Sequence, residues 1–142
     1  MNAVDTNILV YAVDATEPVK STRAIELLSE LARREVPLVV PWQVAAEFLA
    51  CLRRWEAAGR IGRGDVDAYL RRFVLSLPVV YPTVGSLSLA LDLSQRFSMS
   101  HWDSMLVAAC IEAGVNTLYS EDLSANALYA SVKVINPFVS ES

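Results

Sequence analysis

Short apolar runs alternate with longer helical patterns along this chain, and the alternation restricts the possible folds more than any other feature. The runs predict strands at residues 2–5, 38–40, 79–81, 117–119 and 132–135. Most of them are continuously apolar, as is typical of strands whose two faces are both covered. Strands that alternate with helices predict an α/β fold, with a parallel β-sheet flanked by helices on both faces.

The segments between these runs have helical periodicity. Residues 7–13 are expected to form a short apolar helix or a turn. Helices are expected at residues 17–35, 42–58, 65–76, 84–97, 101–113 and around 123–130. Pro18 stands where a helix start tolerates proline, and Gly59 and Gly114 each follow a helical pattern. A chain of 142 residues without a repeat or linker fits one domain of ordinary size, so we expect a single domain over residues 1–142.

The composition predicts a globular protein, because 54% of the residues are hydrophobic and 20% are charged. No apolar run approaches the roughly 18–20 residues that span a bilayer, and the N-terminus lacks the pattern of a signal peptide. We therefore expect a cytoplasmic protein without membrane contact. Cys51 and Cys110 have apolar neighbours and are expected to be buried thiols, and the single His101 excludes a multi-histidine zinc site.

The net charge of −4 argues against a protein that binds nucleic acid through general basicity. Half of the 12 lysines and arginines nevertheless fall within 20 positions, as Arg53, Arg54, Arg60, Arg63, Arg71 and Arg72. Two interpretations stay open for this cluster. It is either an ordinary solvated helical surface or a local rim, including Arg53, Arg54, Arg60 and Arg63, that contacts RNA phosphates.

Four acidic residues stand beside apolar segments. They are Asp5, Glu47, Asp103 and Asp122. An ionised carboxylate beside buried surface is costly unless it is paired, hydrogen-bonded or bound to a cation. Basic residues are scarce near them in sequence, and oxygen ligands suit Mg²⁺ or Mn²⁺. Asp5 and Asp122 also lie at or just past strand ends, where sites form in parallel sheets. The pattern therefore predicts a divalent-cation site.

Each acid also has a simpler interpretation. Capping the helix that follows it could be the sole role of Asp5. The aliphatic stem of Glu47 could lie along the apolar stripe of its helix, with the carboxylate in water or beside Arg54. Asp103 stands at the third position of a helix that Ser100 would cap, a role that is compatible with binding metal. Asp122 could belong to a polar loop.

Three further polar residues are candidates for supporting the acids. Thr6 and Asn7 follow Asp5 directly, and we expect them to hold the turn and to orient its carboxylate. Ser120 precedes Asp122 by two residues and offers a hydroxyl that could order a metal-bound water.

The order of the four acids and their neighbours resembles that of the PIN-domain nucleases, and among these the toxins of VapC-type toxin–antitoxin pairs. The matching segments are Val4-Asp5-Thr6-Asn7-Ile8-Leu9-Val10-Tyr11-Ala12, Val44-Ala45-Ala46-Glu47-Phe48, Ser100-His101-Trp102-Asp103-Ser104-Met105-Leu106-Val107-Ala108-Ala109 and Leu118-Tyr119-Ser120-Glu121-Asp122-Leu123. The ending Ile135-Asn136-Pro137-Phe138 is similar too. The resemblance covers essentially the whole chain.

The resemblance implies a PIN-like three-layer α/β/α fold and a Mg²⁺- or Mn²⁺-dependent endoribonuclease. By position, the family's four acids correspond to Asp5, Glu47, Asp103 and Asp122, and its hydroxyl position corresponds to Ser120. It further implies a homodimer and a cognate antitoxin that blocks the site.

Three other functions compete with this one. The same acids could serve another metal-dependent phosphoesterase or a DNA nuclease, or they could be caps and loops in a non-catalytic binding domain. A receiver-type signalling domain would need an acid after a central strand and a lysine after a late one. Here residues 79–81 run into Pro82 and Thr83, and Lys133 lies within the last expected strand, which argues against a receiver domain.

Overall fold

A six-stranded sheet forms the centre of the molecule in the computed structural model, which describes residues 1–139. The strands are β1 (Asn2–Val4), β2 (Leu38–Pro41), β3 (Val79–Val80), β4 (Thr117–Tyr119), β5 (Leu128–Tyr129) and β6 (Val132–Ile135). Their order across the sheet is β3-β2-β1-β4-β6-β5. All neighbouring strands are parallel except β5, which pairs antiparallel with β6.

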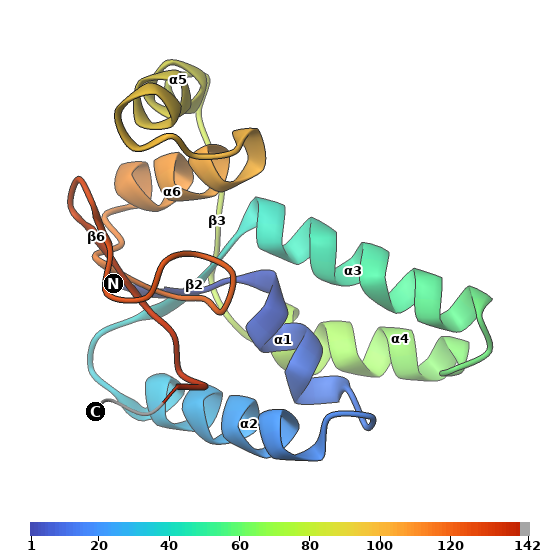
Figure 1. Cartoon of the computed structure of the whole chain (residues 1–142). Coiled ribbons are helices and arrows are strands. Elements are labelled where there is room, and N and C mark those ends of the chain that lie inside the picture. Colours follow the sequence, from blue (N-terminus) through green and yellow to red (C-terminus); the bar gives the residue numbers. More distant parts are fainter. Residues whose placement is uncertain (140–142) are drawn as a thin grey trace.

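Helices cover both sides of this sheet, as predicted. They are α1 (Thr6–Val13), α2 (Pro18–Arg33), α3 (Trp42–Ala57), α4 (Arg63–Leu70), α5 (Gly85–Phe97) and α6 (His101–Ala113), with a π-helical turn at Arg71–Leu75. Figure 1 shows α5 and α6 on one side of the sheet and α1 and α2 on the other. The predicted α/β fold is therefore confirmed.

The central strands β1, β2 and β4 are buried because helices cover both their faces. Val4, Val40 and Leu118 have no exposed surface, which explains why these runs lack the alternation of a half-exposed strand. Cys51 and Cys110 are buried free thiols, as expected. Among the helices of residues 1–139, none is both long enough and apolar enough to cross a bilayer.

The prediction of a helix around residues 123–130 is wrong. Turns lead instead into β5, and the backbone has positive φ at Asn126 (62°) and Ala130 (53°), which a right-handed helix does not allow. Hydrogen bonds to β6 stabilise this course, with Val134 N donating to the carbonyl of Ala127 at 2.9 Å. The antiparallel pairing with β6 thus determines the structure of this segment, and the local helical pattern does not.

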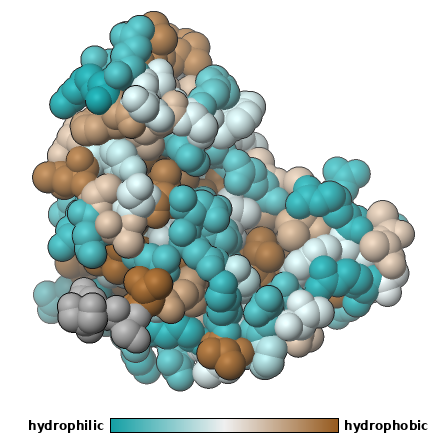
Figure 2. Space-filling view, viewed as in Figure 1, coloured by the Kyte–Doolittle hydropathy of each residue, from teal (hydrophilic) through white to brown (hydrophobic). Residues whose placement is uncertain are grey.

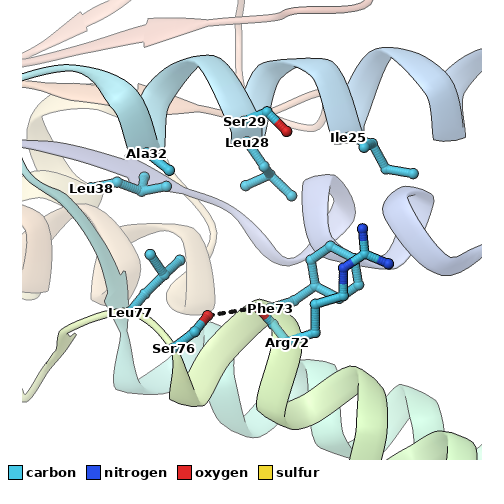
Figure 3. Close-up of a pocket in the computed structure, with 9 residues that line it drawn as sticks. All are labelled: Ile25, Leu28, Ser29, Ala32, Leu38, Arg72, Phe73, Ser76 and Leu77. Atoms are coloured by element: carbon cyan, nitrogen blue, oxygen red, sulfur yellow. Dashed lines mark hydrogen bonds between the residues drawn. The ribbon is translucent and has the colours of Figure 1, made fainter.

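The helix expected at residues 65–76 is divided between α4 and the π-helical turn. The turn forms one wall of a small groove of about 180 Å³, whose other wall is α2 (Figure 3). Phe73 of the turn and Leu77, which follows the turn, point into the groove, toward Leu28 of α2 and Leu38 of β2. Phe73 belongs to the hydrophobic core, so the turn attaches the α3–α4 side of the molecule to α2.

The outer surface is mixed in character. Figure 2 shows that hydrophilic residues surround the scattered hydrophobic ones on the face seen in Figure 1. The ring of Phe73 is 7% exposed, whereas Leu75, two residues later in the same turn, is 59% exposed. These two side chains therefore offer a matched pair for measuring how much the packing of the turn stabilises the fold.

We expect Phe73→Ala to lower the free energy of unfolding by about 3–5 kcal/mol, because it removes a buried ring and leaves a cavity. Leu75→Ala should change it by less than about 0.5 kcal/mol, because that side chain is largely in water. Urea denaturation of the two variants and the wild-type protein measures both effects. Equal losses would show that the turn does not pack as described.

Candidate active site

Asp5 is the most buried of the four candidate acids. It follows the last residue of β1 and is the N-cap of α1, with 7% of its surface exposed. The backbone N–H of Thr6 donates to Asp5 Oδ1 at 2.7 Å, and Ser120 Oγ donates to Asp5 Oδ2 at 2.7 Å. Both oxygens of the carboxylate are therefore fixed, one by its own helix and one by the neighbouring strand.

Ser120 joins Asp5 to the loop that carries Asp122. Strands β1 and β4 are adjacent and parallel, with Val4 opposite Tyr119, so Asp5 and Ser120 leave the sheet at the same edge. Ser120 is fully buried, and its Oγ also accepts from the backbone N–H of Asp122 at 3.2 Å. The pairing of these strands, which are far apart in sequence, thus places Asp122 near Asp5.

Side chains in the first turn of α1 form hydrogen bonds with two more of the four acids, Glu47 and Asp122. Asn7 Nδ2 donates to Asp122 Oδ2 at 3.0 Å, and Thr6 Oγ1 donates to Glu47 Oε2 at 2.7 Å. Asp5, Glu47 and Asp122 therefore come together around one helix N-terminus, from β1, α3 and the loop after β4. The Thr6 side chain contacts Glu47, and the Asn7 side chain contacts Asp122. We expected both residues to orient the carboxylate of Asp5, but only the backbone N–H of Thr6 donates to it.

Asp103 lies at the third position of α6, where its backbone N–H donates to Ser100 Oγ at 3.3 Å. A contact between α3 and α6 brings this helix end close to Glu47. Gln43 Nε2 donates to both Glu47 Oε1 and the carbonyl of Trp102, each at 3.1 Å. The carboxylate of Asp103 itself has no hydrogen bond to the other three acids within residues 1–139.

Gln43 was missed by the sequence reasoning. It precedes Glu47 by four residues, so the two side chains lie on the same face of α3. That spacing was the available signal. Its second contact, to the carbonyl of Trp102, joins segments 59 positions apart and has no local signature.

The electrostatics of the group are unfavourable without a cation. The pKa of Asp5 is raised from 3.8 to about 6, and burial is the main cause. The charges of Asp122 and Glu47 act in the same direction as burial, while the hydrogen bonds from Ser120 and Thr6 lower the pKa. None of the ion pairs within residues 1–139 includes any of the four acids. The protein therefore gathers negative charge here without a basic partner.

A hollow of about 460 Å³ opens beside the group. It is lined by Thr6, Asn7, Val10, Tyr11, Glu47, Ala50, Cys51, Arg54 and Asp122. The carboxylate oxygens in and around it are the ligand type that Mg²⁺ and Mn²⁺ prefer. Arg54 is the only one of the four predicted RNA-contacting arginines that lines this hollow.

The carboxylate ligands suit a divalent ion, but their side chains do not surround a single metal position. Among residues 1–139, no three His, Cys, Asp or Glu side chains stand close enough to hold one ion. Thr6 and Asn7 instead bind one oxygen each of Glu47 and Asp122. Mg²⁺ keeps several of its waters when it binds protein, so carboxylates that do not all reach one ion directly can still bind it through water.

The other three arginines lie away from the hollow. Arg60 Nη2 is 3.2 Å from Asp14 Oδ1, and its guanidinium lies 4.1 Å from the centroid of the Trp55 ring. Arg53 and Arg63 are exposed on α3 and α4. The structure therefore brings one member of the predicted cluster to the acids and leaves the other three elsewhere on the α3–α4 surface.

The raised pKa of Asp5 predicts a pH-dependent stability without metal. A carboxyl whose pKa is higher in the folded than in the unfolded state stabilises the fold below about pH 4 and loses that contribution as the pH rises through about 6. We therefore expect Asp5→Asn to match the wild-type protein near pH 4 and to be more stable by on the order of 3 kcal/mol above pH 6. Urea denaturation in EDTA measures this difference. A difference that stays constant between pH 4 and 7 would contradict the assignment.

Comparison with known proteins agrees with the fold. A family model described as the PIN domain matches residues 3–129. No curated protein matches the sequence. Among solved structures, Mycobacterium tuberculosis VapC20, described as a toxin that cleaves the sarcin–ricin loop, is similar with a TM-score of 0.63 at 19% identity, covering 86% of this chain and 90% of that one.

Two further structures share the fold. A toxin–antitoxin complex from Klebsiella pneumoniae gives a TM-score of 0.69 at 13% identity, covering 97% of this chain and 98% of that one. VapBC2 from Rickettsia felis, bound to a DNA fragment from its promoter, gives a TM-score of 0.68 at 14% identity, covering 94% and 96%. The predicted resemblance is confirmed. Since the family model spans most of the sequence, this chain belongs to the PIN domain family.

Proposed function

We propose that this protein is a Mg²⁺- or Mn²⁺-dependent endoribonuclease and the toxin of a VapBC-type toxin–antitoxin pair. The observation that carries the proposal is the buried carboxylate of Asp5, which faces Glu47 and Asp122 without any basic partner. Such an arrangement is costly unless a cation binds it. The PIN domain family and the shared fold with VapC20, a toxin that cleaves the sarcin–ricin loop, support RNA as the substrate.

Four residues would hold the ion. Asp5 and Asp103 are proposed as the main ligands, and Glu47 and Asp122 bind directly or through water. A divalent ion held by these residues would supply Lewis-acid chemistry: it would lower the pKa of a bound water, polarise the phosphodiester and offset the charge of the transition state. The expected products are a 5′-phosphate and a 3′-hydroxyl.

The remaining residues orient these ligands. Ser120 fixes one oxygen of Asp5, while Thr6 and Asn7 fix the exposed carboxylates of Glu47 and Asp122. An oxygen of Glu47 or Asp122 that does not contact the ion can accept the proton of the attacking water. Ser120 lies beneath the site with no exposed surface, so its role is to hold Asp5 and the loop after β4.

Arg54 is the proposed contact for a phosphate next to the cleaved bond, because it lines the same hollow as Glu47 and Asp122. Arg53, Arg60 and Arg63 would contact phosphates farther along the strand, on the α3–α4 surface. This arrangement lets an acidic protein bind RNA through a local rim of arginines.

The expected partners follow from the same family. We infer a single-domain cytoplasmic protein over residues 1–142, which forms a homodimer and is blocked by a cognate antitoxin that covers the acidic hollow. The Klebsiella pneumoniae structure is a toxin–antitoxin complex, which supports an antitoxin for this chain as well. The other candidate is a DNA nuclease or another metal-dependent phosphoesterase, which the same carboxylates could serve.

We expect the purified protein to cleave RNA with Mg²⁺ or Mn²⁺ and to stop when EDTA is added. Asp5→Asn and Asp103→Asn should each lower the rate at least about 100-fold while the protein stays folded, because each removes a charged ligand. Asp92→Asn is the matched control, since Asp92 pairs with Arg96 on the exposed face of α5. The assay should include DNA and small phosphate esters. Preferential cleavage of DNA or of a small phosphate ester would contradict the proposal, and full activity in Asp5→Asn or Asp103→Asn would contradict the role of that residue.

Replacing Arg54 tests the substrate contact separately from catalysis. We expect Arg54→Gln to weaken RNA binding and to lower the slope of log affinity against log salt concentration by about 0.7, the value for one phosphate of a single strand. Arg96→Gln, which removes an arginine on α5, should leave the slope unchanged. Fluorescence anisotropy with the inactive Asp5→Asn protein measures both, and an unchanged slope for Arg54→Gln would exclude this contact.

A further inference from the structure

Lys20 of α2 reaches the loop that carries Asp122. Its Nζ donates to Glu121 Oε1 at 2.5 Å and to the Tyr11 hydroxyl at 3.2 Å. The same Nζ lies 4.7 Å from the centroid of the Tyr11 ring. The side chains of Lys20 and Glu121 are only 35% and 25% exposed, so this ion pair is better shielded than the others on α4 and α5.

The cluster joins three segments that lie apart in sequence. Tyr11 belongs to α1, Lys20 to α2, and Glu121 to the loop between β4 and β5. On the opposite side of the loop, Asn7 Oδ1 accepts from the backbone N–H of Glu121 at 3.3 Å. Glu121 is therefore held through both its side chain and its backbone, and its carboxylate is turned toward α2.

Lys20 and Glu121 form an ion pair. Burial works to raise the pKa of Glu121, but the hydrogen bonds from Lys20 and Tyr11 outweigh it and lower that pKa below the ordinary value. The hydrogen bond to Glu121 also raises the pKa of Lys20. The contact is therefore a charge-assisted hydrogen bond, which holds a loop more firmly than a neutral one.

Asp122 is the next residue after Glu121, so the direction of one side chain limits the direction of the other. With Glu121 held toward Lys20, Asp122 is turned to the other side of the loop, where Asn7 Nδ2 donates to it at 3.0 Å. Loss of the Lys20 contact would let the loop rotate about the anchor that Ser120 provides. The carboxylate of Asp122 would then be misplaced, while the rest of the fold would be unchanged.

We propose that Lys20 is a positioning residue of the metal site, which acts through Glu121 to keep Asp122 directed toward Asn7 and the hollow. This inference rests on the proposed metal-dependent function. A positioning role and a purely electrostatic role for Lys20 predict opposite changes in metal affinity. A cation near the site repels a divalent ion, so removing Lys20 should strengthen metal binding if its charge were all that mattered. If Lys20 positions a ligand, its removal should weaken binding instead.

The test is the dissociation constant for Mn²⁺, measured by calorimetry on the full chain without RNA. We expect Lys20→Met to weaken Mn²⁺ binding about tenfold or more, in the range found for residues that orient metal ligands. Lys133→Met is the matched control, because Lys133 is the other lysine of the chain, lies exposed on β6 and should leave the constant unchanged. Faster hydrogen exchange at the amides of Asp122 and Leu123 should accompany the loss.

Unchanged or tighter Mn²⁺ binding by folded Lys20→Met would overturn the inference, and so would a rise in KM for RNA with an unchanged metal constant. If Lys20→Met does not fold, Tyr11→Phe removes one hydrogen bond of the same cluster. It should weaken Mn²⁺ binding in the same direction, and an unchanged constant would overturn the inference. A wild-type protein that neither binds Mn²⁺ nor cleaves RNA would instead refute the proposed function, and the inference with it.

Discussion

The burial of the Asp5 carboxylate at the edge shared by β1 and β4 is the constraint on which the site depends. Strand pairing places Ser120 beside Asp5, and the hydrogen bond between them at 2.7 Å fixes both the acid and the start of the following loop. Asp5 also caps α1. The first turn of α1 then positions Thr6 and Asn7 against Glu47 and Asp122. One carboxylate thus links the order of the strands to the geometry of the acids.

The cluster of carboxylates lowers the stability of the protein without metal and favours the binding of a cation. Burial and two neighbouring carboxylates raise the pKa of Asp5, so its ionised form destabilises the protein without metal. A ligand that binds only the folded state adds stability in proportion to the logarithm of its concentration. A divalent ion, or a cationic group from a protein partner, would therefore relieve the same repulsion. Active sites commonly carry such local costs, which the rest of the fold offsets.

Much of this could be predicted from the sequence because the signals were local. Continuous apolar runs indicated the buried strands, and Asp5 and Asp122 stood at strand ends, where a parallel sheet brings side chains together. The resemblance to the PIN domain family supplied the order of the acids. The placement of Asp103 with the other acids stays a prediction, and the contact that joins α3 to α6 through Gln43 was not predicted.

The remaining features depend on contacts between distant segments. The helical pattern at residues 123–130 gives way to pairing with β6, and left-handed backbone at Asn126 and Ala130 accompanies the change. Lys20 and Glu121 are 101 positions apart, so nothing in either segment predicted their ion pair. The arginine cluster looked uniform in sequence, yet only Arg54 lines the hollow beside the acids.

The most direct test of the central claim is an anomalous-difference map from crystals of the protein grown with Mn²⁺. We expect a peak at the carboxyl end of β1, in contact with the side chain of Asp5 and within reach of the acids from α3, α6 and the loop after β4. A map from saturated crystals with no peak at Asp5, or with manganese bound only at another surface, would contradict it.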